Sequence, residues 1–131
     1  MSPWRLDYTA ALERWDVDRI VAALADDVLI RVAVHDAPMH GREVARFLFA
    51  TLAEELGPLR PVQEIVEGRS AVLLFETSIG ERAAQGLNVL QQTADGAIAE
   101  LTVFFRPLDA LQRIAEVIGA RMAARFGPPE A

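Results

Sequence analysis

The chain has 131 residues, a formal net charge of −6 and no cysteine. This length predicts one domain, 1–131, and the absence of cysteine excludes disulfides, thiol nucleophiles and thiolate metal sites. The 13 cationic side chains are all arginines scattered along an acidic chain, which argues against nucleic acid and membranes as partners.

The apolar content is high, at 52%. Because this exceeds the usual share in a soluble domain, we expect an apolar cavity, a dimer surface or both. No apolar run approaches the roughly 20 residues that a membrane span needs. Residues 1–15 also lack the continuous apolar segment of a signal peptide. We therefore expect a cytoplasmic protein.

A first helix is predicted at the start of the chain, with Ser2 as its N-cap and Pro3 at its first helical position. Its apolar residues recur at helical spacing and form one stripe, made of Trp4, Tyr8, Ala11, Leu12 and Trp15. Since Tyr8 lies in the middle of this stripe, its ring is expected to face inward. A buried tyrosine hydroxyl normally finds a hydrogen-bond partner.

Asp16 is expected to cap a second short helix, which Asp26-Asp27 would end. A strand over 28–34 follows, in which alternate valine and isoleucine residues form one apolar face and Arg31 points the other way. A loop comes next, and then a helix over 42–56.

The second half of the chain is predicted to consist mainly of strands. A strand over 59–66 contains Pro61, which has no N–H to donate and so indicates a sheet edge. A strand over 71–78 is apolar on both faces, as expected for a central strand covered on both sides. Two further strands form a hairpin. A final helix over 108–126 closes the chain and is ended by Gly127.

The hairpin is predicted to turn at Asp95-Gly96, a strong signal for a tight turn between two strands. A loop of two or four residues pairs Thr93 with Ile98 and Asn88 with Val103, and opposed residues share a sheet face. The expected inner face carries Asn88, Leu90, Leu101, Val103 and Phe105, and the outer face carries Val89, Gln91, Glu100, Thr102, Phe104 and Arg106. Asn88 is then an amide among apolar neighbours and needs a protein, water or ligand partner. A bulge or a three-residue loop would instead turn Asn88 outward.

This order of elements predicts an α+β fold with a largely antiparallel sheet. We expect the sheet to curve around a long helix as a cone, with an apolar pocket that binds a small hydrophobic molecule. The pocket is expected to be lined by Tyr8, Val32, Phe47, Phe75, Asn88, Leu101, Val103 and Phe105. A homodimer is expected through the outer sheet face, at Leu74, Val89, Thr102 and Phe104.

The first third of the chain contains the segments Tyr8-Thr-Ala-Ala-Leu12, Asp16-Val-Asp18, Ile20-Val21-Ala22, Ala25-Asp26-Asp27 and Pro38-x-x-Gly41. This series resembles the N-terminal half of ketosteroid isomerases and, more broadly, the nuclear transport factor two-like or SnoaL-like superfamily. Residues 97–111 are similar to the closing strand and helix of many SnoaL-like bacterial proteins. The resemblance covers most of the chain and implies one cystatin-like, SnoaL-like domain with an extra C-terminal helix. It does not imply one activity, because this fold hosts isomerases, cyclases, epoxide hydrolases, dehydratases and non-catalytic binders.

The isomerases of this superfamily use a carboxylate that moves a proton and two groups that donate hydrogen bonds to an enolate oxygen. The resemblance puts Tyr8 and Asn88 at the donor positions and Val32 at the position of the base. Since valine cannot accept a proton, the resemblance implies a remnant oxyanion site without its base. The Asp-Arg-Asp set of the superfamily's epoxide hydrolases is not found on the expected inner faces.

His35 is the only histidine next to a carboxylate, that of Asp36. This pair could supply acid–base catalysis if its loop lies over the pocket mouth, and is otherwise a solvated loop pair. His35 and His40 do not have a recognised metal-ligand spacing, so we expect no metal and no cofactor. Glu76 and Arg106 fall on outer faces and are expected to form a surface or interface ion pair.

Two classes of function remain open from the sequence. The first is binding of a small hydrophobic, carbonyl-bearing molecule, with or without isomerase, cyclase or dehydratase activity. In the enzyme version Tyr8 and Asn88 polarise the oxygen, and His35 or Asp36 acts as the base. The second is a non-catalytic dimeric assembly module, which is favoured by Val32 and by the absence of inward carboxylates. In that case Tyr8 and Asn88 are a core tyrosine and a structural amide.

Overall fold

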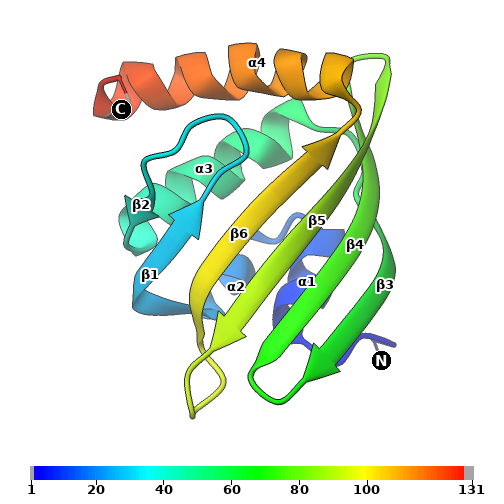
Figure 1. The fold of residues 1–131 in the computed structure, drawn as a ribbon, viewed down its shortest axis with the longest axis vertical. Helices are drawn as coiled ribbons and strands as arrows, with labels where there is room; N and C mark the ends of the chain where they lie inside the picture. The colour runs from blue at the N-terminus through cyan, green and yellow to red at the C-terminus, as the bar shows by residue number, and fades with distance from the viewer. Residues whose placement is uncertain (1, 129–131) are drawn as a thin grey trace.

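The computed structural model describes residues 2–128. Its helices are α1 (Asp7–Glu13), α2 (Val17–Ala22), α3 (Arg42–Glu55) and α4 (Leu108–Phe126). Its strands are β1 (Leu24–Arg31), β2 (Met39–His40), β3 (Arg60–Glu67), β4 (Ser70–Ile79), β5 (Arg82–Gln92) and β6 (Ile98–Arg106). The strands form a curved sheet, and the helices lie on one side of it (Figure 1).

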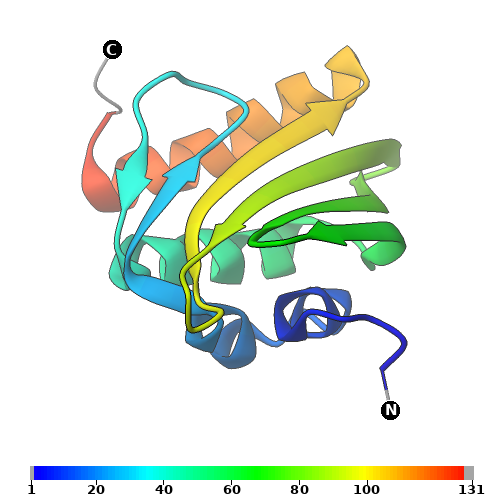
Figure 2. The same cartoon turned by 60° about the horizontal axis from the view of Figure 1, so that its bottom comes forward.

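The six strands form one sheet in the order β2-β1-β6-β5-β4-β3. Neighbouring strands are antiparallel except β1 and β6, which are parallel. The predicted α+β fold with a curved sheet is therefore confirmed, although the sheet is mixed rather than wholly antiparallel. The sheet does not close on itself, and the second view shows it curving over the helices (Figure 2). The strand that contains Pro61 lies at an edge, as predicted.

The hydrophobic core lies between the inner face of the sheet and the helices. Leu73, Leu90 and Leu101 from the sheet belong to one cluster of buried side chains with Ile20 of α2 and Leu48 of α3. Burial of this apolar surface is the main force that holds the sheet against the helices. Within residues 2–128, no helix is long and apolar enough to cross a membrane.

The hairpin of β5 and β6 has the predicted register over most of its length. Asn88 pairs with Val103, and the side chain of Asn88 is only 3% exposed, so the inner face is assigned correctly. Near the turn the pairing shifts, and Ile98 lies opposite Gln92 rather than opposite Thr93 as predicted. The five residues between Gln92 and Ile98 make an odd-length loop that offsets the bulge, so Asn88 still lies opposite Val103 and keeps its predicted face.

The start of α1 differs from the prediction. The helix begins at Asp7 rather than near Ser2, and it has no side-chain cap of its own. Glu64 of β3 supplies the missing acceptors instead. Its carboxylate accepts hydrogen bonds from the backbone N–H of Arg5 at 2.6 Å and from the hydroxyl of Thr9 at 2.6 Å. The helix start is therefore fixed by a strand that is distant in sequence, which a local capping signal cannot reveal.

The end of α2 is also earlier than predicted. Asp16 caps this helix as expected, but the helix stops before Asp26 and Asp27, which lie within β1. Leu24 pairs with Ile98 of β6, and this pairing draws the chain into the sheet. The register of β1 shifts after Leu24, and both aspartates remain exposed. The pairing of β1 with β6 thus decides where α2 ends, and the predicted stop at the two aspartates does not.

The predicted loop after β1 contains a short strand. β1 ends at Arg31 rather than at Val34, and Ile30 and Leu29 pair with the two residues of β2. A two-residue edge strand has no periodic pattern, so it cannot be predicted from periodicity. Residues 32–38 form the loop between β1 and β2.

The later helices have nearly the predicted bounds. In α4, however, the buried residues are Ala110, Ile114 and Ile118, and Leu108 is 68% exposed. Of the residues predicted to be buried, Ile118 is buried, Leu111, Ala115 and Met122 are half-buried, and the prediction for Leu108 is wrong. This helix has apolar residues on more than one side, so packing against the sheet decides which of them are buried.

Candidate functional site

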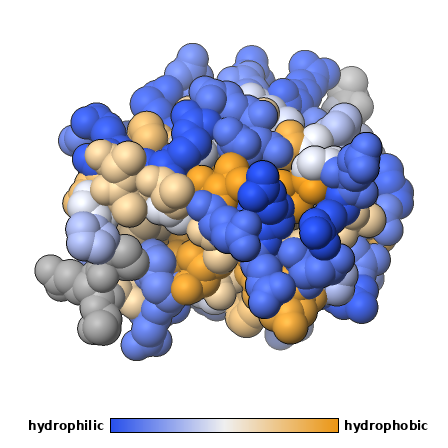
Figure 3. Space-filling view, turned by 90° about the horizontal axis from the view of Figure 1, so that it is seen from above, coloured by the Kyte–Doolittle hydropathy of each residue, from blue (hydrophilic) through white to orange (hydrophobic). Residues whose placement is uncertain are grey.

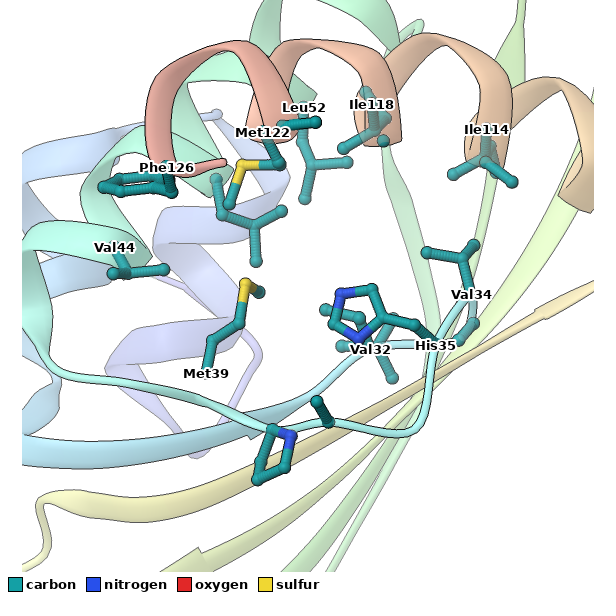
Figure 4. Close-up of a pocket in the computed structure, with 18 of the residues that line it drawn as sticks. Val32, Val34, His35, Met39, Val44, Leu52, Ile114, Ile118, Met122 and Phe126 are labelled. Atoms are coloured by element: carbon teal, nitrogen blue, oxygen red, sulfur yellow. The ribbon is translucent and has the colours of Figure 1, made fainter. Parts of the chain in front are cut away.

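A cavity of about 510 Å³ lies between α3, α4, the inner side of the sheet and the β1–β2 loop. Figure 4 shows α4 along one side of it and the loop along the opposite side. Apolar side chains, glycines and prolines make up nearly all of its lining. They are Val32, Ala33, Val34, Ala37, Pro38, Met39, Val44, Leu48, Leu52, Val103, Phe105, Ile114, Ala115, Ile118, Gly119, Met122, Ala123, Phe126, Gly127 and Pro128.

The sequence of α4 keeps this space open. Ala115, Gly119 and Ala123 are spaced four residues apart, so they form one row on the helix surface, and all three line the cavity. A Cβ built on Gly119 meets no atom within 4 Å. The larger side chains of Ile118 and Met122 lie beside this row. Because these three side chains are small, they leave a volume unfilled on the cavity side of α4.

His35 is the polar side chain that projects into the cavity (Figure 4). It is half-buried, and its Nδ1 atom is buried without a hydrogen-bond partner among residues 2–128. His40 also lines the cavity but is exposed, as is Asp36, which does not line it. In the described part of the chain no salt bridge joins His35 to Asp36. The acid–base role of this pair stays a prediction.

Tyr8 and Asn88 lie together in the core. They are 1% and 3% exposed, and the hydroxyl of Tyr8 donates a hydrogen bond of 2.8 Å to Oδ1 of Asn88. The Tyr8 ring packs edge-on against Phe49, with ring centroids 6.2 Å apart. Burial raises the pKa of the Tyr8 hydroxyl well above its ordinary value, so the group is a neutral donor and not a base. The two residues meet as the sequence led us to expect, but neither is among those that line the cavity.

The other predicted lining residues divide into two groups. Val32, Val103 and Phe105 line the cavity, whereas Phe47, Phe75 and Leu101 do not. Two of the residues outside the lining pack against residues of the lining. The Phe75 ring lies edge-on against Phe105, with ring centroids 5.8 Å apart. The Phe47 ring lies edge-on against Phe126, with ring centroids 5.5 Å apart. Direct contact of these side chains with a ligand stays a prediction.

Charged groups are kept outside the cavity. No arginine, aspartate or glutamate among the described residues lines it. Arg121 of α4 instead pairs with Glu54 and Glu55 of α3, at 2.7 and 3.2 Å. The face seen from above is mostly hydrophilic, with separate hydrophobic areas between the charged side chains (Figure 3). The cavity is therefore suited to an apolar and uncharged molecule.

Comparison with known proteins gives matches only among solved structures, because no protein-family model and no curated protein matches the chain. An uncharacterised protein with a cystatin-like fold from Silicibacter pomeroyi DSS-3 has a TM-score of 0.81 and 23% identity over 91% of this chain and 89% of its own. A steroid delta-isomerase from Pseudomonas aeruginosa has a TM-score of 0.80 and 24% identity over 96% and 98%. An NTF2-like protein of unknown function from Cytophaga hutchinsonii ATCC 33406 has a TM-score of 0.61 and 14% identity over 80% and 88%.

This chain has the cystatin-like, NTF2-like fold. The predicted resemblance to the nuclear transport factor two-like and SnoaL-like superfamily is confirmed at the level of the fold. At these identities the likeness carries no activity with it. Val32 lines the cavity, and no carboxylate among residues 2–128 lines it with Val32.

The sequence predictions missed most of the cavity wall that α4 provides. Ile114, Ile118 and Met122 line the cavity, and Met39 faces it from β2 (Figure 4). The signal that was available is the row of small residues at 115, 119 and 123, because small side chains beside large apolar ones can leave space at a helix face. In residues 2–128, no three His, Asp or Glu side chains are placed to share a metal ion.

Proposed function

We propose that this NTF2-like chain binds a small apolar molecule in the cavity between α3, α4 and the β1–β2 loop. One observation carries the proposal. The cavity has a volume of about 510 Å³, and apart from His35 and His40 every described residue that lines it is apolar, glycine or proline. Ligand sites typically have volumes of roughly 300–1,000 Å³ and combine an apolar lining with a few polar groups.

The expected affinity is moderate. A ligand that buries about 250 Å² of apolar surface gains roughly 6 kcal/mol at about 25 cal/mol per Å². Contact between well-packed surfaces adds dispersion energy, and the loss of translational and rotational freedom subtracts from the total. Since roughly 6 kcal/mol corresponds to a dissociation constant of about 40 micromolar, we expect constants on the order of 10–100 micromolar for a general apolar probe.

The test is a substitution on α4 that fills part of the cavity with a larger side chain. Gly119→Phe places an aromatic ring in the space where a Cβ meets nothing within 4 Å. Gly119→Ala is the matched control, since it adds only a methyl group and improves the helix propensity of α4. The probe is prodan, a fluorescent naphthalene ketone whose emission shifts to the blue in apolar surroundings.

We expect wild type and Gly119→Ala to bind prodan alike, and Gly119→Phe to bind it at least about tenfold more weakly. Circular dichroism and the melting temperature verify that each variant is folded. A folded Gly119→Phe variant that binds prodan as wild type does would overturn the proposal, as would a wild-type protein that does not bind it.

Carbonyl chemistry is the second candidate function, and the Tyr8–Asn88 hydrogen bond favours it. Both side chains can donate to an oxygen, and a steroid delta-isomerase has the same fold as this chain. Isomerase, cyclase or dehydratase activity of this kind would need the ligand to reach the pair through the cavity wall. Any turnover that is unchanged in both Tyr8→Phe and Asn88→Ala would reject these roles.

We further propose a homodimer through the outer sheet face. Val62, Ile65 and Phe104 lie on or beside the sheet and are 48%, 48% and 50% exposed. No helix among the described residues covers this face (Figures 1 and 2), so the second layer predicted to cover β4 is not a helix of this part of the chain. Leu74 and Leu87 line a shallow hollow of about 410 Å³ beside Phe104. An isologous contact between two copies would bury this apolar face.

A further inference from the structure

The β1–β2 loop brings the imidazole of His35 into a cavity whose described lining is apolar apart from His35 and His40. The His35 ring extends from the loop toward the interior, and the larger side chains around it are Val32, Val34 and Ile114 (Figure 4). A single polar group in such surroundings costs free energy unless a partner satisfies it. The His35 side chain is thus the group that can favour a ligand with a polar atom over a purely apolar one.

The two nitrogens of His35 have different surroundings. Nδ1 is buried and has no partner in residues 2–128. An orphaned buried N–H is rarer in proteins than an orphaned acceptor, so the neutral ring is expected to keep its proton on Nε2. One ring nitrogen is directed to the interior of the cavity in Figure 4. In this tautomer His35 offers a hydrogen-bond donor to whatever occupies the cavity.

The Tyr8–Asn88 pair does not compete for this role. The Tyr8 hydroxyl already donates to Asn88 at 2.8 Å, and neither residue lines the cavity. No charged side chain of the described chain lines it either, so an anionic ligand would lack a counter-ion. The chemistry that fits is a neutral apolar molecule with one oxygen acceptor.

We infer that Nε2–H of His35 donates a hydrogen bond to a carbonyl oxygen of the bound molecule, and so selects apolar ketones and esters over hydrocarbons of the same size. This inference rests on the proposed binding function. It assigns the polar contact with the ligand to His35 of the β1–β2 loop. It does not assign this contact to Tyr8 of α1 or to Asn88 of β5. His35 is in this view a specificity-determining residue and needs no partner carboxylate.

The experiment compares two probes that differ in the carbonyl group. Prodan has it, and its propyl analogue, 2-dimethylamino-6-propylnaphthalene, has a methylene group in place of the carbonyl. Each is titrated into wild type, His35→Leu and His35→Gln. Gln112→Leu is the matched control, because Gln112 is exposed on α4 and does not line the cavity.

We expect His35→Leu to weaken prodan binding about 5- to 30-fold, since one hydrogen bond is lost. Binding of the propyl analogue should change by less than about twofold, and Gln112→Leu should leave both probes unchanged. His35→Gln should recover part of the prodan affinity, because its amide can donate. Prodan bound to wild type should also emit at longer wavelength than prodan bound to His35→Leu, as a hydrogen bond to its carbonyl stabilises the excited state.

The outcomes separate the two proposals. If His35→Leu weakens both probes equally, His35 only packs against the ligand and the inference is wrong while the binding function stands. If both probes bind every variant alike, the inference is also wrong. If neither probe binds wild type, the proposed function itself fails. A long-range proton–nitrogen correlation spectrum adds a direct check, since a neutral His35 with its proton on Nδ1 contradicts the inference.

Discussion

Tyr8 of α1 and Asn88 of β5 are 80 residues apart in sequence and share a hydrogen bond of 2.8 Å in the core. Each satisfies a polar group of the other, so the pair joins the first helix to the centre of the sheet. In an apolar interior such a bond is strong when made and costly when broken. The pair therefore contributes to the stability of the fold.

The first prediction concerns the ionisation of Tyr8. It is the only tyrosine of the chain, so tyrosinate absorbance reports on it alone. Burial raises the pKa of its hydroxyl above the ordinary value of 10.0. In the folded protein we expect no tyrosinate signal as the pH rises from about 9 to 11, whereas the unfolded chain should titrate near its ordinary pKa. A native protein that titrates near pH 10 would contradict the burial of this group.

The same shift predicts a loss of stability in alkali. Above the ordinary pKa the unfolded chain releases the Tyr8 proton while the folded chain retains it. The unfolded state then binds fewer protons, so the free energy of unfolding falls as the pH rises above about 10. Urea unfolding at several pH values measures this slope. The Tyr8→Phe variant should show a smaller slope in the same range.

The second prediction concerns the energy of the Tyr8–Asn88 pair. Tyr8→Phe leaves Oδ1 of Asn88 without its donor and should lower the free energy of unfolding by about 1–3 kcal/mol. Asn88→Ala should be at least as costly because it also leaves a cavity. The double variant should lose less than the sum of the two, with a coupling of about 0.5–1.5 kcal/mol. Purely additive losses would show that the hydrogen bond contributes nothing.

The third prediction concerns the start of α1. Glu64 accepts hydrogen bonds from Arg5, Leu6 and Thr9, at 2.6, 3.3 and 2.6 Å. Glu64→Ala removes all of these and should lower the free energy of unfolding by about 1–3 kcal/mol. Glu67→Ala is the control, because Glu67 is exposed at the end of the same strand. Faster amide exchange at the start of α1 in Glu64→Ala alone would locate the effect.

The fourth prediction tests the proposed dimer. Phe104 is 50% exposed on the outer sheet face, and Leu108 is 68% exposed on α4. Phe104→Glu should convert a dimer into a monomer, because it would bury a charge in the contact. Leu108→Glu adds the same charge away from that face and should leave the dimer intact. Sedimentation equilibrium gives the masses. A wild-type protein that is monomeric at micromolar concentration contradicts the proposal.

The fifth prediction concerns a close contact in the sheet. Gly86 lies between Phe75 and Phe105 in the pairing of β4, β5 and β6. A methyl group at Gly86 would overlap the ring of Phe75, which is 4% exposed and has little room to move. Gly86→Ala should therefore lower the free energy of unfolding by about 1–3 kcal/mol. Gly119→Ala, where the space is open, should not destabilise the protein.

The sequence by itself determined the elements whose signals are local. The Asp95-Gly96 turn and the alternation of apolar residues set the hairpin faces, and Asn88 is buried as that pattern required. The bounds of α4 follow from Leu108 and Gly127, and the resemblance in the first third of the chain predicted the fold. These features depend on residues close in the chain, so a single sequence contains them.

The tertiary structure decided what depends on distant contacts. Glu64 fixes the start of α1, and the pairing of Leu24 with Ile98 places the two aspartates in β1. The orientation of α4 places its row of small residues, at 115, 119 and 123, along the cavity, where they leave space unfilled. The β1–β2 loop then directed His35 into it. Helix rotation and loop path are set by packing across the whole fold, and no local pattern encodes them.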